Sequence, residues 1–300
     1  MKLRGYLLLI FFSLLFLFYP GDSEYFKTFA YNKELFSKNN TPTDIKILPV
    51  PYIKAPYYPN ITAEGAYILD LLSFTPVFEK NVQTTFFPAS TTKIITALVA
   101  YDIFKSDDNV TIKRIINEGQ SMGLVTGEKI SVENLLYGVL VHSGNDAAFA
   151  LADYYEYDKF VKLMNKKAQS LGMKNSYFKN PAGLDETGQI TTAYDLSLAA
   201  RELLKNKYLS KITSTKEIVI SDADFNYFHK LVNVNKLLGE VQGIGGLKTG
   251  YTESAGENLI SFYKKNGHQF IIIVLKSSDR FKDTKEIVKW IGENVDYLNL

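Results

Sequence analysis

The chain has 300 residues, 46% of them apolar, so it can bury a sizeable core as one large domain or two small ones. Its formal net charge is +2, a near balance that gives no case for nucleic-acid binding. It has no cysteine, which excludes disulfides, thiolate zinc sites and a cysteine nucleophile, and its three histidines form no H-E-x-x-H pair.

The first residues have the pattern of an export segment. Lys2 and Arg4 precede an apolar run over residues 6–19, which Pro20 ends. A basic start, a short apolar stretch and a turn are typical of exported proteins, although this run is short for a membrane span and no A-x-A site follows it. We therefore expect residues 1–21 to be a signal peptide or an N-terminal anchor in the cytoplasmic membrane. Either one places the rest of the chain outside the cytoplasm, in the cell envelope.

Residues 22–60 are expected to form a stalk. They are rich in tyrosine and proline and show no sustained hydrophobic period. Proline removes backbone donors and is disfavoured inside helices and sheets, so a semi-extended spacer is the simplest interpretation. The folded domain is then expected to span residues 61–300.

This domain is predicted to begin with a β-hairpin, because strand-like segments 66–72 and 76–80 flank a short turn. Helices are predicted next, at residues 91–104, 131–141, 145–155, 158–171 and 193–204. β-Branched and aromatic segments then predict strands at 217–220, 246–248, 258–263 and 269–275, before a closing helix at 284–297. Strands at both ends and helices between them indicate an α+β fold, with an antiparallel sheet built from both chain ends and an inserted helical subdomain.

Three S-x-x-K sequences occur, and their expected secondary structure separates them. A serine and a lysine three residues apart share a face on a helix and lie on opposite faces of a strand. Ser261–Lys264 falls in a predicted strand, and Ser176–Lys179 runs into Asn180-Pro181, which opposes a helix. Ser90–Lys93 opens an apolar helix, so only this pair is expected to bring its amine to its hydroxyl.

A buried Lys93 would be a suitable base for Ser90. Burial disfavours the charged amine and lowers its pKa, so that a neutral lysine can take the serine proton. The N-terminus of the helix also favours the negative charge that develops during attack. The structural alternative is that Ser90 is an ordinary N-cap and Lys93 a side chain that extends to solvent.

Two further short motifs follow in the chain. Ser143-Gly144-Asn145 could present a hydroxyl and an amide to a peptide, and Lys248-Thr249-Gly250 could present a cation and a hydroxyl beside a closely approaching backbone. Each is weak alone, since Ser143 could be a helix N-cap and 248–250 a strand that ends in a turn. Together they give the order S-x-x-K, S-x-N, K-T-G, a set used by β-lactamases and penicillin-binding proteins.

The surrounding residues resemble one family within that group. Pro88-Ala-Ser-Thr-Thr-Lys-Ile-Ile-Thr-Ala, Val141-His-Ser-Gly-Asn-Asp-Ala-Ala and Gly245-Gly-Leu-Lys-Thr-Gly-Tyr-Thr-Glu-Ser-Ala-Gly are similar to segments of the low-molecular-mass D-alanyl-D-alanine carboxypeptidases, and so is Asn180-Pro-Ala-Gly-Leu. The resemblance covers residues 63–300. It implies a β-lactamase/transpeptidase-like fold and a penicillin-sensitive serine peptidase that acts on peptidoglycan stem peptides ending in D-Ala-D-Ala.

The resemblance also implies a role for each motif residue. Ser90 would be the nucleophile, Lys93 its base and Ser143 a proton relay to the leaving amine. Asn145 would hold the acyl chain's amide, while Lys248 and Thr249 would face the substrate's terminal carboxylate and Gly250, in the same substrate-binding motif, would let a backbone approach closely. The backbone N–H groups of Ser90 and Tyr251 would form the oxyanion hole, and no metal or organic cofactor is needed. β-Lactams would acylate Ser90.

Three alternatives stay open. An endopeptidase that cuts D-alanyl cross-links would use the same residues. A class A-like β-lactamase would need a glutamate to activate water, yet neither Glu186 nor Glu202 stands in the E-x-x-L-N setting of that class. A non-catalytic wall-binding domain would be expected to have lost Lys93 or Lys248, and both are present.

Overall fold

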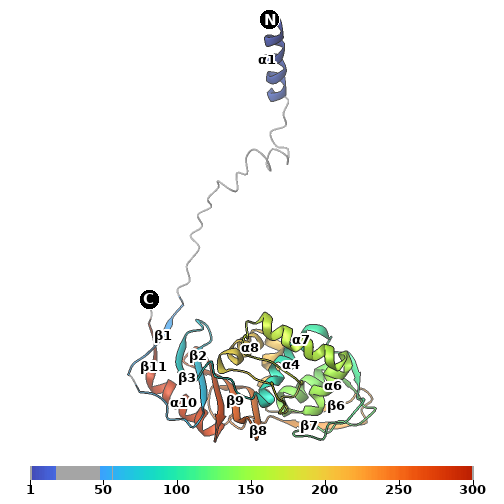
Figure 1. Cartoon of the computed structure of the whole chain (residues 1–300), viewed down its shortest axis with the longest axis vertical. Helices are drawn as coiled ribbons and strands as arrows, with labels where there is room; N and C mark the ends of the chain where they lie inside the picture. The colour runs from blue at the N-terminus through green and yellow to red at the C-terminus, as the bar shows by residue number, and fades with distance from the viewer. Residues whose placement is uncertain (1, 18–47, 56, 299–300) are drawn as a thin grey trace. The chain divides into compact units, whose positions relative to one another are not determined.

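The computed structural model describes residues 2–17, 48–55 and 57–298, which belong to two separate units, 1–47 and 48–300. In the first unit, α1 (Lys2–Leu17) matches the apolar run expected from the sequence (Figure 1). Among the described residues, none of the helices combines the length and hydropathy needed to cross a membrane. Of the stalk predicted over residues 22–60, residues 22–47 lie outside the described part of the chain.

The second unit is built on a five-stranded antiparallel sheet in the order β3-β2-β10-β9-β8. The first two strands come from the start of the unit and the other three from its end, which confirms the predicted sheet of both chain ends. The strands are β2 (Gly65–Asp70), β3 (Pro76–Lys80), β8 (Ile244–Thr252), β9 (Gly256–Lys265) and β10 (His268–Ser277). Asn266 and Gly267, both with positive φ, form the turn between β9 and β10.

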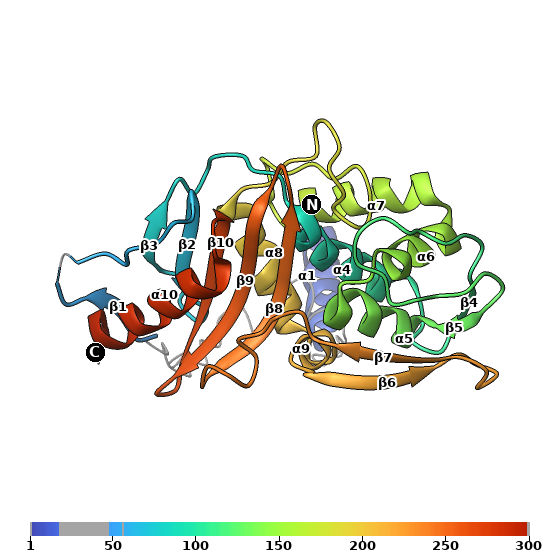
Figure 2. The same ribbon diagram turned by 90° about the horizontal axis from the view of Figure 1, so that it is seen from below.

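Both faces of the sheet are covered. In β10, Phe270, Ile272 and Val274 pack in a core with Trp290 of α10 (Arg280–Asn294). Its intervening residues Ile271, Ile273 and Leu275 join the larger core of the helical block. Figure 2 shows α10 in front of the sheet and α8 behind it. Helices on both faces explain why β10 is apolar without alternation.

The inserted block contains the expected helices and several short elements. Its 3₁₀ turn and first helix are η1 (Ala89–Thr92) and α4 (Lys93–Ile103), and a π-helical turn, η2 (Gly138–His142), extends the helix that Ser131 caps. The remaining elements are β4 (Asn109–Thr111), β5 (Lys129–Ser131), α5 (Val132–Tyr137), α6 (Asn145–Tyr155), α7 (Tyr157–Ser170), α8 (Ala193–Lys205), α9 (Lys207–Thr213), β6 (Glu217–Ser221) and β7 (Phe228–Val232). β4, β5, α9 and β7 were not expected from the sequence.

The ends of the second unit differ from the prediction. β1 (Val50–Ile53) pairs with β11 (Val295–Leu298), so the folded unit begins by residue 48 rather than at residue 61. The closing helix stops at Asn294, and its predicted last turn is instead strand β11. β1 tolerates Pro51 because a strand in a two-stranded ribbon has one side free of ladder bonds.

Candidate active site

The turn that carries Ser90 is held from two sides. Ala89, directly before it, has a positive φ of 47°, a strained value that its neighbours must enforce. A Cβ added to Gly183 would lie 1.8 Å from the Ala89 carbonyl oxygen, so this loop packs backbone to backbone against the turn. On the other side, the Asn258 side chain of β9 donates to the carbonyls of Phe87 and Pro88 at 3.0 and 3.2 Å. Ser90 itself stays partly exposed.

Lys93, one helical turn later, is fully buried and points at that serine. Its Nζ donates to Ser90 Oγ at 2.9 Å, to Asn145 Oδ1 at 2.6 Å and to the Ala182 carbonyl at 2.8 Å. Burial lowers the pKa of this amine to about 7, and the negative charge of Asp146 opposes that shift only in part. A large share of Lys93 is therefore neutral at neutral pH.

The contacts of Lys93 also orient its lone pair. Both Asn145 Oδ1 and the Ala182 carbonyl can only accept hydrogen bonds, so they take the two hydrogens of a neutral amine. The lone pair is left facing Ser90, whose hydroxyl can then donate to it. This is the arrangement that a general base requires.

The second motif sits at the end of the π-helical turn. Ser143 terminates η2 with a positive φ of 64°, and it is buried. Its Oγ accepts a hydrogen bond of 2.8 Å from Lys248 Nζ. Asn145 opens α6, and both ends of its amide are engaged, since Oδ1 accepts from Lys93 and Nδ2 donates to the Glu118 carbonyl at 2.7 Å. The role expected for Asn145 in holding the acyl chain's amide stays a prediction.

The third motif lies on the edge strand β8. A Cβ on Gly250 would lie 2.9 Å from Ser90 N and 3.2 Å from Thr91 N, so only glycine lets the strand approach the serine turn this closely. Lys248 and Thr249 are both buried, whereas Tyr251 at the strand end is 60% exposed. Burial, with the nearby charges of Lys93 and Arg280, holds the pKa of Lys248 well below its ordinary value.

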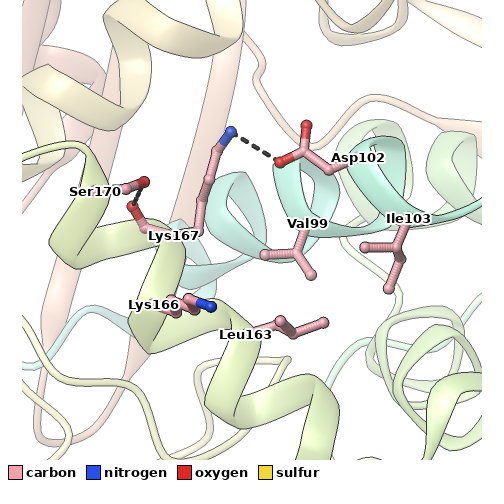
Figure 3. Close-up of a pocket in the computed structure, with 7 residues that line it drawn as sticks. All are labelled: Val99, Asp102, Ile103, Leu163, Lys166, Lys167 and Ser170. Carbon is pink, nitrogen blue, oxygen red and sulfur yellow. Dashed lines mark hydrogen bonds and ion pairs between the residues drawn. The ribbon is translucent and has the colours of Figure 1, made fainter.

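The structure thus joins all three sequence motifs, with Lys93 linking the first to the second and Lys248 linking the second to the third. The two rejected S-x-x-K pairs lie elsewhere. Ser261 is buried in β9 with Lys264 exposed three residues on, and the Ser176 hydroxyl contacts Asp195 and Thr191. Figure 3 shows a small groove between α4 and α7 that contains Lys167, paired with Asp102, and none of the motif residues.

Two residues of this region were missed in the sequence. Asp146 is buried and accepts from Met122 N, Gly123 N and Leu124 N, so it holds a loop against the second motif. Arg280, at the start of α10, donates to the Gly250 carbonyl at 2.7 Å and adds a second cation beside the K-T-G strand. Asp146 was visible as the residue after Ser143-Gly-Asn, but nothing local marks Arg280.

Comparison with known proteins agrees with this geometry. Residues 53–279 match the model of the D-alanyl-D-alanine carboxypeptidase family, peptidase family S11. The chain belongs to this family. It is 35% identical over 241 residues to D-alanyl-D-alanine carboxypeptidase DacF of Bacillus subtilis, covering 76% of this chain and 61% of that protein. DacC of Escherichia coli is 31% identical over 253 residues, which are 77% of this chain and 62% of that protein. The chain therefore spans about three-fifths of the length of these two relatives.

Solved structures show the same fold. The crystal structure of the Streptomyces K15 DD-transpeptidase superposes with a TM-score of 0.74 at 29% identity, covering 78% of this chain and 98% of that one. The carboxypeptidase DacD from Francisella tularensis gives a TM-score of 0.74 at 30% identity, covering 81% of this chain and 73% of that one. The expected α+β, transpeptidase-like fold is confirmed.

Proposed function

We propose that this chain is a serine D-alanyl-D-alanine carboxypeptidase that removes the terminal D-alanine from peptidoglycan stem peptides through an acyl-enzyme on Ser90. The observation that carries the proposal is the buried amine of Lys93, 2.9 Å from Ser90 Oγ and with a pKa lowered to about 7. A lysine that served only structure would have little reason to sit uncharged against a partly exposed hydroxyl.

Acylation would begin with transfer of the Ser90 proton to Lys93. The serine oxygen attacks the carbonyl between the last two D-alanines, and the negative charge that forms on the carbonyl oxygen is stabilised by the backbone N–H groups of Ser90 and Tyr251. The close packing of Gly250 against Ser90 brings the backbone of β8 next to the serine turn, which supports an oxyanion hole shared by these two N–H groups. Collapse of the intermediate breaks the peptide bond and leaves the ester on Ser90.

The leaving amine needs a proton, which Ser143 would deliver. Its hydroxyl accepts from Lys248 Nζ, so its own hydrogen is free to point away from that amine and toward the cleft. The hydroxyl would then take a proton from Lys248 Nζ, and this pair would recover the proton that Lys93 took from Ser90, which leaves Lys93 neutral again. Water then hydrolyses the ester, releasing the trimmed peptide and restoring Ser90 and Lys93.

The free carboxylate of the substrate is expected at the K-T-G strand. Arg280 would supply positive charge there and Thr249 a hydroxyl, and a bound carboxylate would in turn favour the charged form of Lys248, while burial of Lys248 and Thr249 keeps water from weakening the attraction. This preference for a terminal carboxylate favours a carboxypeptidase and is shared by β-lactams, which also carry one. We therefore expect penicillins to acylate Ser90.

Related activities would use the same acyl-enzyme. A transpeptidase, the activity in the name of the Streptomyces K15 structure, or an endopeptidase differs in the acceptor or in the leaving group rather than in the residues around Ser90. A β-lactamase would need a carboxylate to activate water. In the described part of the chain, the three hydrogen-bond partners of Lys93 Nζ are a hydroxyl, an amide oxygen and a backbone carbonyl, so none of them is such a carboxylate.

The substrate places the enzyme outside the cytoplasm. Peptidoglycan stem peptides lie in the cell envelope, and the basic, apolar start of the chain fits export, either as a cleaved signal peptide or as an anchor at the outer face of the membrane. Detection of the chain's N-terminal residues in the mature cell-envelope protein would separate an anchor from a cleaved signal.

Labelling with a fluorescent penicillin tests the function directly. The intact protein should form a covalent adduct and release D-alanine from a pentapeptide ending in D-Ala-D-Ala, whereas Ser90→Ala should do neither. Ser176→Ala is the matched control, because this serine belongs to a second S-x-x-K sequence and should leave labelling unchanged. Equal labelling of the wild type and Ser90→Ala would refute the nucleophile, and rapid turnover of penicillin without release of D-alanine would favour a β-lactamase.

A further inference from the structure

We propose that Glu128 and His229, a buried pair outside all three motifs, are positioning residues that set the geometry of the active site by fixing the backbone of Met122. This inference rests on the proposed function, since it concerns the reactivity of Ser90. It gives a role to His229, one of the three histidines for which the sequence suggested no function.

The pair lies where the hairpin of β6 and β7 meets the loop before β5. His229 Nε2 and Glu128 Oε1 are 2.7 Å apart, and the two residues are 6% and 3% exposed. The second carboxylate oxygen, Oε2, accepts from Val125 N at 2.9 Å. The other ring nitrogen, His229 Nδ1, is 3.2 Å from the Met122 carbonyl oxygen.

Counting hydrogens shows which nitrogen of His229 must carry the hydrogen that faces Met122. A carbonyl oxygen can only accept, so His229 Nδ1 must carry the hydrogen that reaches Met122. One further hydrogen must lie between Nε2 and Oε1 to make their contact attractive. Glu128 therefore fixes both the orientation of the ring and the nitrogen that faces Met122, as a carboxylate does when it orients a histidine elsewhere.

Met122 is held from three directions. Its carbonyl contacts His229, and its N–H donates to Asp146 Oδ1 at 3.0 Å. Its side chain packs on Gly138, where an added Cβ would lie 2.3 Å from the Met122 sulfur. Gly138 begins the π-helical turn that ends at Ser143, so a shift of Met122 would be felt at both Ser143 and Asp146.

The same loop reaches Lys93 through Asn145. The Gln120 carbonyl accepts from Asn145 N at 2.7 Å, and the Glu118 carbonyl accepts from Asn145 Nδ2 at 2.7 Å. The far end of that amide, Oδ1, takes a hydrogen of Lys93 at 2.6 Å. If the loop moved, Asn145 would lose the backbone partners that hold its oxygen on the amine, and the lone pair of Lys93 would no longer be aimed at Ser90.

Kinetics can separate positioning from simple stability. The experiment measures the rate of acylation by a fluorescent penicillin across pH, alongside thermal unfolding, for wild type, Glu128→Ala and Glu128→Gln. The alanine variant should be acylated about ten- to a hundredfold more slowly, the range in which small misplacements of reacting groups fall. The midpoint of its acid limb should also move above that of the wild type, because water reaching Lys93 raises the pKa of the amine.

The glutamine variant is the conservative rescue. Its carboxamide oxygen can accept from Val125 N and its NH₂ group can donate to His229 Nε2, which leaves Nδ1–H for Met122. We expect its rate and pH midpoint to stay near wild type. Glu217→Ala is the matched control, since Glu217 lies on the same hairpin and pairs with Lys230 only at the surface, 3.5 Å apart.

His229→Gln is a second variant, which tests the proposal even if Glu128→Ala does not fold. In His229→Gln the side chain can still donate to Glu128 but has no second nitrogen for Met122, so acylation should slow and the acid limb should shift as above. Folded variants with the wild-type rate and midpoint would overturn the inference, and so would a glutamine variant as slow as the alanine one. A wild type that takes no penicillin label would instead overturn the proposed function.

Discussion

Two buried polar clusters of this molecule tie distant parts of the chain together, yet they do so in opposite ways. At the active site, two buried amines with lowered pKa, Lys93 and Lys248, contact the hydroxyls of Ser90 and Ser143. At the start of α10, the buried carboxylate of Asp283 accepts four hydrogen bonds of 2.6–2.9 Å, from Ser277 Oγ and from groups of Thr62 and Ala63. We call the second group the Asp283 cluster.

The difference lies in whether each charge is satisfied. The Asp283 carboxylate is surrounded by neutral donors, which stabilise it without a counter-ion. The two lysines instead repel each other, and burial destabilises their charged forms. A cluster that serves stability is satisfied, and one that serves chemistry stores unfavourable interactions that the rest of the fold must offset.

Replacing Lys93 should give the largest effect, and it should disrupt the active-site cluster while leaving the Asp283 cluster intact. Lys93→Met keeps much of the side-chain volume but removes the base, so we expect penicillin acylation to fall by about 10²- to 10⁴-fold, the usual contribution of a general base. Thermal unfolding should change little, because removing the buried amine also removes its desolvation cost. Lys167→Met, on α7 beside the groove of Figure 3, is the matched control and should keep the wild-type rate. Undiminished labelling of Lys93→Met would disprove the base.

The pH dependence of acylation should follow the pKa of Lys93. The amine must be neutral to accept the serine proton, and its pKa is about 7, so the rate should fall as pH drops through that value. Below it, each pH unit should cost about tenfold, because the neutral fraction falls tenfold. Rates measured in the wild type from about pH 5 to about pH 9 check this. A midpoint near that of an ordinary lysine would mean that Lys93 is solvated and would weaken the contrast with Asp283.

Much of this site could be predicted from the sequence because its motifs are local. The three-residue spacing of Ser90 and Lys93 is informative only on a helix, and the apolar run after Lys93 predicted that helix. The same argument correctly set aside Ser261–Lys264, which lies on β9. The resemblance of the K-T-G segment, rather than its strand pattern, implied that Tyr251 lies near Ser90, and the close approach of Gly250 to Ser90 is known only from the structure.

What the sequence did not reveal depends on long-range contacts. Arg280 reaches Gly250 across 30 residues, and Asp283 reaches Thr62 across 221. The strand β11 was predicted as the end of a helix because its few residues continue the apolar spacing of α10, and only pairing with β1 makes them a strand. The early start of the folded unit was missed for the same reason, because β1 has little stability without its partner.

Replacing Asp283 should break the other cluster and leave the chemistry intact. Asp283→Ala removes the acceptor of Thr62 and leaves the buried donors of Ala63 and Ser277 without their carboxylate, and we expect the free energy of unfolding to drop by about 3 kcal/mol. Denaturant unfolding measures this loss. The folded variant should be acylated at the wild-type rate with an unchanged pH midpoint. Glu202→Ala, which removes an exposed pair with Lys205, should change stability by less than about 1 kcal/mol. A slower folded Asp283→Ala would show that the two clusters are coupled.

The smallest expected effect is at the β1–β11 ribbon, where a carboxylate accepts from neutral donors, as in the Asp283 cluster. Tyr297 Oη donates to Asp70 Oδ1 at 2.7 Å, and burial together with that carboxylate raises the pKa of the phenol, so it remains a donor across the physiological range. Tyr297→Phe removes one hydrogen bond while Asp70 keeps its bonds from Ser73 at 2.7 Å, so the loss should be about 1–2 kcal/mol. Denaturant unfolding checks this loss, and penicillin acylation should be unaffected. A change in acylation rate would mean that the ribbon is coupled to Ser90 through β2 and β10. The two clusters would then not be independent, because the sheet that joins them would transmit changes from one to the other.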